Sequence, residues 1–141
     1  RHQNIIRNYF LNGDYDYLLM LESDVFAGEC IIENLVSYAD VYGASIVTAT
    51  YEIRKEEDLL CLTSTSDRRA VRSEKILTRE HGYDIMGQGT LFGREVLEQV
   101  EFRVDLELNA NAFSDTFIFT DAEKLGHKIL INSNLICTHN K

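Results

Sequence analysis

The chain has 141 residues, and its 14 lysines and arginines stand against 23 aspartates and glutamates, a net charge of −9. This length suffices for one domain with a real core, and a composition of 45% hydrophobic and 26% charged residues excludes disordered, collagen-like and coiled-coil proteins. The acidic balance argues against nucleic-acid binding, which relies on clustered lysine and arginine. No apolar run approaches the ~20 residues of a membrane-spanning helix, so we also expect no membrane segment.

The first half of the chain has strong periodic patterns. Residues 4–10 carry apolar side chains at helical spacing, and Gly13 then predicts the end of a helix. A continuous apolar run over residues 15–21 predicts a strand buried on both faces. Residues 28–42 predict an amphipathic helix, and residues 44–51 a second strand. Strand, helix and strand with short connections form a βαβ unit, which predicts parallel strands covered by helices.

The second half begins with an excursion over residues 52–79, in which we expect one or two strands. Its basic stretch from Arg68 to Arg79 is either a lid over a bound diphosphate or a solvated surface. The patterns further on predict a strand over 83–92, helices over 94–100 and 113–125, and extended segments over 128–132 and 135–138.

Three cysteines, Cys30, Cys61 and Cys137, form no CxxC pair, which argues against a disulfide framework and a structural zinc site. A reduced compartment follows as the simpler expectation, with a cytoplasmic or membrane-peripheral location. The chain starts at Arg1 without a methionine or a signal-peptide pattern, which indicates a segment excised from a longer protein.

Two carboxylates, Glu22 and Asp24, directly follow the first predicted strand. Ligands of open α/β sheets bind beyond the carboxyl ends of strands, and carboxylate oxygens suit a hard cation. The same residues have a purely structural explanation, which is to cap the helix that follows. The spacing alone leaves both interpretations open.

Five motifs occur in an order that points to a known family. They are the Asn-Gly-Asp-Tyr-Asp-Tyr stretch at 12–17, the Glu-Ser-Asp triplet at 22–24, the Gly-rich segment at 86–97, the acidic opening of a helix at 115–117, and the stretch 122–129 followed by His139. In this order they resemble nucleotide-sugar glycosyltransferases of the GT-A fold, especially family two.

The resemblance implies a fold class and a domain. The expected class is α/β, a three-layer α/β/α arrangement with a mixed, mainly parallel sheet of the GT-A, nucleotide-diphospho-sugar transferase-like type. Family members begin with nucleotide-binding strands that would precede this chain, so the fold is expected to be truncated at its N-terminus. Residues 1–141 would then be one partial domain that holds the metal-binding and acceptor side.

The resemblance also implies a metal site for Mn²⁺ or Mg²⁺. Asp24 would be a direct metal ligand and His139 a second one. Glu22 would reach the metal through water or contact the ribose of the donor. A lone histidine such as His139 also has a structural interpretation, and the sequence does not decide between the two.

The remaining site residues concern the sugar and its acceptor. Asp115 matches the carboxylate that takes the proton of the acceptor hydroxyl, although it also suits a helix N-cap. The residues Asp105 and Glu107 are substitutes for that role. Gly87 and Gly89 would let the backbone approach the donor sugar, or they form a turn or bulge.

The function that follows is metal-dependent transfer of a sugar from a nucleoside-diphosphate donor to a carbohydrate, lipid or protein hydroxyl, with inversion at the anomeric carbon. A retaining enzyme of the same fold is one alternative. A non-catalytic GT-A-like binding or assembly module is another, and a cation-dependent nucleotidyltransferase-like protein is a third.

Overall fold

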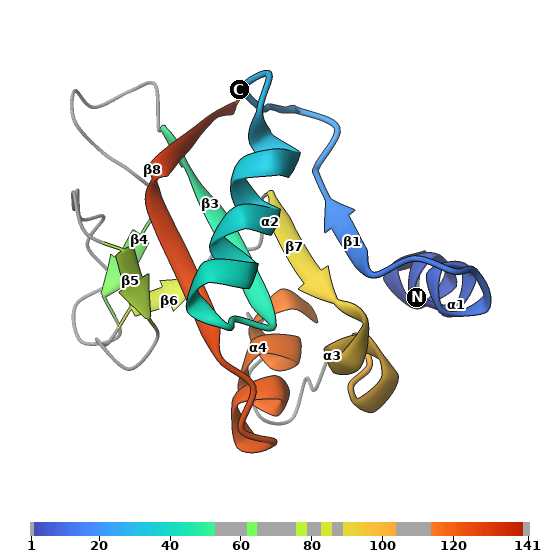
Figure 1. The fold of residues 1–141 in the computed structure, drawn as a ribbon. Coiled ribbons are helices and arrows are strands. Elements are labelled where there is room, and N and C mark those ends of the chain that lie inside the picture. The colour runs from blue at the N-terminus through green and yellow to red at the C-terminus, as the bar shows by residue number, and fades with distance from the viewer. Residues whose placement is uncertain are drawn as a thin grey trace.

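The computed structural model describes residues 2–52, 62–64, 76–78, 83–85, 89–103 and 114–139. Its helices are α1 (His2–Asn12), α2 (Ile31–Tyr42), α3 (Arg94–Gln99) and α4 (Ser114–Lys124). Its strands are β1 (Tyr17–Met20), β2 (Val25–Phe26), β3 (Ile46–Glu52), β4 (Leu62–Ser64), β5 (Ile76–Thr78), β6 (Tyr83–Ile85), β7 (Thr90–Gly93) and β8 (Ile129–His139) (Figure 1).

The predicted helices are confirmed, with ends that follow from local chemistry. The amide of Gly13 donates to the carbonyl of Phe10 over 3.1 Å just after α1. Gly43 ends α2 in the left-handed conformation at φ 59°, and its amide donates to the carbonyl of Ala39. Gly126 follows α4 at φ 85°. Glycine carries no Cβ to oppose positive φ, so it terminates α2 and α4 at little cost.

The larger sheet has the strand order β1-β7-β3-β8-β2, and β5 also pairs with β8. Only the β3–β8 pair is parallel among these described strands, and the other pairs are antiparallel. The strands β4 and β6 form a separate two-stranded antiparallel sheet.

The expected fold class, a three-layer α/β/α arrangement of GT-A type on a mainly parallel sheet with a truncated start, is wrong. The described chain forms a small mixed sheet that curls into a half-barrel with a few helices. The physical reason is β7, which lies between β1 and β3 and runs antiparallel to both. The two outer strands of the predicted βαβ unit therefore never pair with each other.

The last strand also differs from the prediction, because its two extended segments form one strand. The register of β8 against β3 shifts between Ala49 and Thr50. Next to this bulge, the side-chain oxygen of Asn132 accepts a hydrogen bond from the amide of Asn134 over 3.0 Å. Local bonds of this kind compete with the ladder, which explains why a turn-like sequence lies inside a strand.

The core has two main clusters, on opposite faces of the sheet. Ile46 and Val47 are neighbours on β3, and they belong to different clusters because successive side chains of a strand point to opposite faces. The α2 residues Leu35 and Ala39 pack in the cluster of Val47, whereas α3 and α4 contribute to the cluster of Ile46. Among the described residues, no helix is both long enough and apolar enough to cross a membrane.

Candidate functional site

The strands place most of the predicted site residues at one edge of the sheet. β1 is antiparallel to β7, β7 is antiparallel to β3, and β3 is parallel to β8, so β1, β3 and β8 point the same way. Their carboxyl ends lie together in Figure 1, where β7 begins. We call this region the site edge, and it comprises the turn Glu22–Val25, Gly89 and the end of β8 at His139.

The turn after β1 presents both carboxylates of the triplet. The amide of Val25 donates to the carbonyl of Glu22 over 3.1 Å, which closes the turn. Glu22 is exposed and Asp24 is partly exposed, whereas Val25 is buried. The N-cap residue of α2 is Cys30, whose side chain makes no capping hydrogen bond, so neither acid is the N-cap of that helix.

His139 lies close in the backbone to the turn. The β2–β8 register places His139 opposite Val25 and Thr138 opposite Phe26. Asp24 is the residue before Val25, so the fold brings the backbone of the predicted second ligand beside the predicted first one. The side chain of His139 lies outside the described part of the structure.

Gly89 is buried at the site edge with a backbone that favours glycine. Its φ is 72°, and its carbonyl accepts a hydrogen bond from the amide of Ala49 over 3.0 Å. A Cβ at this position would lie 3.4 Å from the Cys137 Sγ and 3.5 Å from a methyl carbon of Leu21. Turn geometry and close packing therefore explain this glycine. Gly87 lies outside the described residues.

Asp115 lies in the first turn of α4. The helix precedes β8 and runs back against it, so its first turn is the end directed toward the site edge (Figure 1). The side chain of Asp115 lies outside the described part, as do Asp105, Glu107 and, apart from the β5 residues 76–78, the basic stretch from Arg68 to Arg79.

The residue types at the site edge are carboxylate and imidazole, both of which are ligands of divalent cations in proteins. Among the described side chains, no three His, Cys, Asp or Glu groups are arranged to hold a metal ion. A metal site here would need the side chain of His139, which lies outside the described part, together with Glu22 and Asp24.

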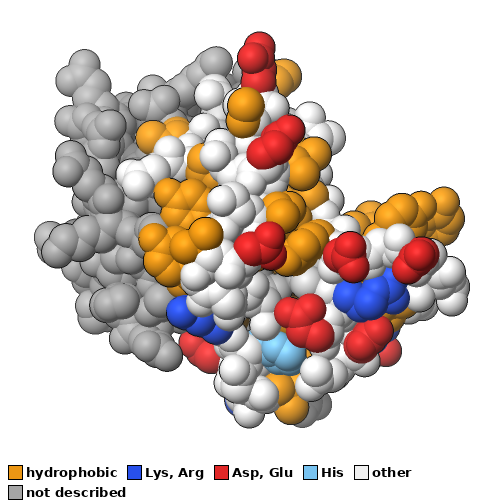
Figure 2. All heavy atoms as spheres, in the orientation of Figure 1, with side chains coloured by type: hydrophobic (Ala, Val, Ile, Leu, Met, Phe, Trp, Pro, Cys, Tyr) orange, Lys and Arg blue, Asp and Glu red, His pale blue; other side chains and the backbone are white. Residues whose placement is uncertain are grey.

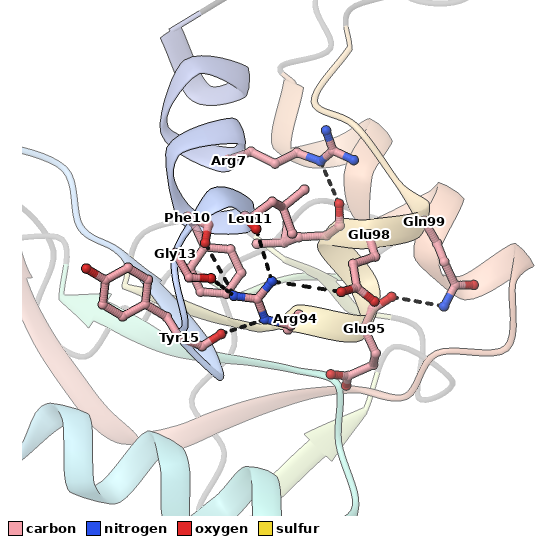
Figure 3. A network of polar contacts seen from close by, with 10 residues as sticks. Arg7, Phe10, Leu11, Gly13, Tyr15, Arg94, Glu95, Glu98 and Gln99 are labelled. Atoms are coloured by element: carbon pink, nitrogen blue, oxygen red, sulfur yellow. Dashed lines mark hydrogen bonds and ion pairs between the residues drawn. The ribbon is translucent and has the colours of Figure 1, made fainter.

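Two arginines with structural roles were not predicted from the sequence. Arg94, at the start of α3, donates to backbone carbonyls between residues 10 and 15 (Figure 3). Arg7 is buried on α1, and its Nε donates to the carbonyl of Leu97 over 2.6 Å. Neither residue stands in a recognisable local motif, because the acceptors are distant in sequence.

A phenol–carboxylate hydrogen bond ties β1 to α2. The hydroxyl of Tyr17 donates to the Asp40 Oδ1 over 2.8 Å. Burial, and then the hydrogen bond to Asp40, raise the pKa of Tyr17 to about 12 from an ordinary value of 10.0. A raised pKa means that folding favours the neutral phenol.

This raised pKa predicts alkaline destabilisation. The contribution of Tyr17 is complete below pH 10.0, and it is lost as the pH rises toward about 12. We expect Tyr17→Phe to cost about 1 kcal/mol at neutral pH and to flatten the fall in unfolding free energy over that window. Urea unfolding at a series of pH values measures both effects. The control Tyr9→Phe, at an exposed tyrosine of α1, should keep the slope, and an unchanged slope in Tyr17→Phe would contradict the prediction.

A second charged cluster lies away from the site edge, between the ends of α3 and α4. Arg103 forms two hydrogen bonds of 2.6 and 2.9 Å with the carboxylate of Asp121, beside a pocket of about 370 Å³. The hydrogen bond from Arg103 holds the pKa of Asp121 below its usual value. The cations are matched by carboxylates there, so the cluster is a structural ion pair.

Acidic side chains are spread over the face covered by α2, as Figure 2 shows, in agreement with the net charge of −9.

Cys30 is an exposed free thiol and Cys137 a buried one, and burial raises the pKa of Cys137. A raised pKa leaves the thiol protonated and unreactive. Cys61 lies outside the described residues.

No protein-family model and no curated protein sequence matches the chain. A crystal structure of A197 from STIV is similar in fold, with a TM-score of 0.62 and 20% sequence identity. The similarity covers 97% of this chain and 64% of A197, so the chain spans less than two thirds of that protein. At this identity the likeness concerns the fold alone, and it supports the small curled sheet in place of the expected class.

Proposed function

We propose that this chain carries the metal-binding and acceptor side of a glycosyltransferase that uses a nucleoside-diphosphate sugar and a divalent cation. The observation that carries the proposal is the register of β2 against β8, which sets His139 opposite Val25 at the carboxyl end of β1. This juxtaposition joins residues that are far apart in the sequence.

Three residues would bind the cation and the donor. Asp24 and His139 would hold Mn²⁺, and Glu22 would contact it through water or bind the ribose. When bound, such a cation neutralises charge on a diphosphate leaving group. The carboxylates at the site edge would otherwise repel a diphosphate, since the chain carries a net charge of −9.

Asp115 would act on the acceptor. As the acceptor oxygen attacks the anomeric carbon, Asp115 takes its proton, and the bond from that carbon to the diphosphate breaks with its electron pair on the departing oxygen. Attack from the side opposite the leaving group inverts the anomeric configuration. The acceptor would be a carbohydrate, lipid or protein hydroxyl.

The test measures Mn²⁺ binding by electron paramagnetic resonance, with and without a panel of nucleoside diphosphates. We expect Asp24→Asn to weaken binding by at least about tenfold, because it removes a charged ligand. Asp14→Asn, which removes an equal charge from an exposed residue before β1, should bind as the unmodified chain does.

Equal binding by the two variants would contradict the metal assignment. Release of nucleoside diphosphate from a panel of nucleotide sugars then separates an enzyme from a binding module. A chain that binds Mn²⁺ and diphosphate through Asp24 without releasing diphosphate from any donor would support the module.

A further inference from the structure

We infer that Arg94 positions the Glu22–Val25 turn by fixing the register of β1 against β7. This inference rests on the proposed function for the importance of that turn, and on the contacts of Arg94 for the positioning itself. Arg94 is a positioning residue in this account, because it acts through β1 and lies away from the carboxylates.

Hydrophobicity alone does not fix the register of β1. Tyr17 and Leu19 pack with the α2 cluster, whereas Leu18 and Met20 pack with the cluster of α3 and α4. In a strand with one polar face, a slip of one residue exposes apolar side chains and is opposed strongly. In β1 the same slip exchanges apolar for apolar side chains. Another set of contacts must therefore select the register.

Arg94 provides these contacts at the start of the strand. Its side chain donates to the carbonyls of Tyr15 over 2.7 Å and Gly13 over 2.6 Å, and to those of Leu11 and Phe10 over 3.3 and 3.4 Å. Figure 3 shows these oxygens on one side of the guanidinium and the carboxylate of Glu98 on the other. The backbone amide of Arg94 also donates to the carbonyl of Asp16 over 2.9 Å.

These bonds fix the entry to β1 at a defined point on β7. Arg94 directly follows the last residue of β7, Gly93, which pairs with Tyr17. The carbonyls of Phe10 and Leu11 lie in the last turn of α1, where a helix runs out of amides to pair with them. The Phe10 carbonyl accepts from the amide of Gly13, and the guanidinium is a donor to both carbonyls at that helix end. One side chain thus ties the end of α1 and the entry to β1 to the end of β7.

The position of the carboxyl end of β1 depends on the register that is fixed at its start. In the observed register Met20 pairs with Thr90, and Leu21 packs beside Gly89. A slip of one residue would move the turn by about 3.3 Å along β7 and would reverse the faces of β1. Glu22 and Asp24 would then leave their place beside the end of β8.

The test compares Arg94→Lys with Arg7→Lys in the full chain. Arg7 is a matched control, because its bonds go to Leu97, Glu101 and Asn8 and not to the entry of β1. We expect both variants to unfold at lower urea concentration. Only Arg94→Lys should weaken Mn²⁺ binding, by about tenfold, and speed hydrogen exchange at the amide of Val25, which closes the turn.

Similar losses of affinity and of Val25 protection in Arg7→Lys, or neither loss in Arg94→Lys, would overturn the inference. If the unmodified chain binds no Mn²⁺, the proposed function fails, and Val25 exchange in the two variants still decides the positioning role. If Arg94→Lys does not fold, native-state exchange of the unmodified chain in urea replaces it. The amides of Leu19 and Val25 should then open together, and independent opening would refute the coupling.

Discussion

Replacement of Phe119 by alanine is expected to lower the free energy of unfolding by about 3–5 kcal/mol, a large share of the ~5–15 kcal/mol typical of a domain. Phe119 lies in α4 and is 1% exposed. Its ring stacks on Phe92 at 6.1 Å, and Phe92 meets Phe102 edge to face at 5.7 Å. Removal of the ring leaves a cavity beneath the sheet and breaks this aromatic chain at one end.

Urea unfolding followed by circular dichroism measures the effect. The control is Phe26→Ala on β2, where the ring is 62% exposed and truncation should cost about 1 kcal/mol or less. A loss at Phe119 no larger than that at Phe26 would mean that α4 does not pack on the sheet as described.

Gly89→Val is the second substitution with a large expected effect, and it should lower the free energy of unfolding by about 2–4 kcal/mol. Two costs add at this position. A φ of 72° is strained for a β-branched residue, and the new side chain would press on Cys137, Ala49 and Leu21. The displaced elements are those that form the site edge, so Mn²⁺ binding should weaken as well.

Gly43→Val separates the cost of backbone strain from the cost of side-chain overpacking. Gly43 has a similar φ of 59°, but a Cβ there meets nothing within 4 Å. We therefore expect only the backbone cost, about 1–2 kcal/mol, and unchanged Mn²⁺ binding. Equal losses in the two variants, by urea unfolding and metal titration, would show that the packing around Gly89 is unimportant.

The local elements of the fold could be predicted from the sequence because their causes are local. Apolar spacing and terminal glycines such as Gly43 and Gly126 define α2 and α4 within one or a few residues of the observed ends. The sheet topology could not be predicted in this way. Insertion of β7 between β1 and β3 depends on pairing over more than 40 residues, which no periodicity within one segment reveals.

The candidate site, too, could be predicted from the sequence only where its causes are local. Glu22 and Asp24 could be placed at a sheet edge because they follow an apolar run that predicts a strand, and the structure puts them there after the half-buried β1. Their metal role and that of His139 stay predictions. Arg94 was missed because its partners are backbone oxygens, which leave no trace in residue identity. A residue that binds the main chain has no complementary side chain for a sequence pattern to show.

That same property of Arg94 has a consequence for how the protein can change. Its four carbonyl acceptors exist whatever side chains occupy the exposed positions of this segment. Substitution of the exposed Asn12 or Asp14 should therefore be tolerated while the path of the chain is kept, whereas Phe10 is also held by its buried ring. The connection can thus diversify while a single distant arginine preserves its shape.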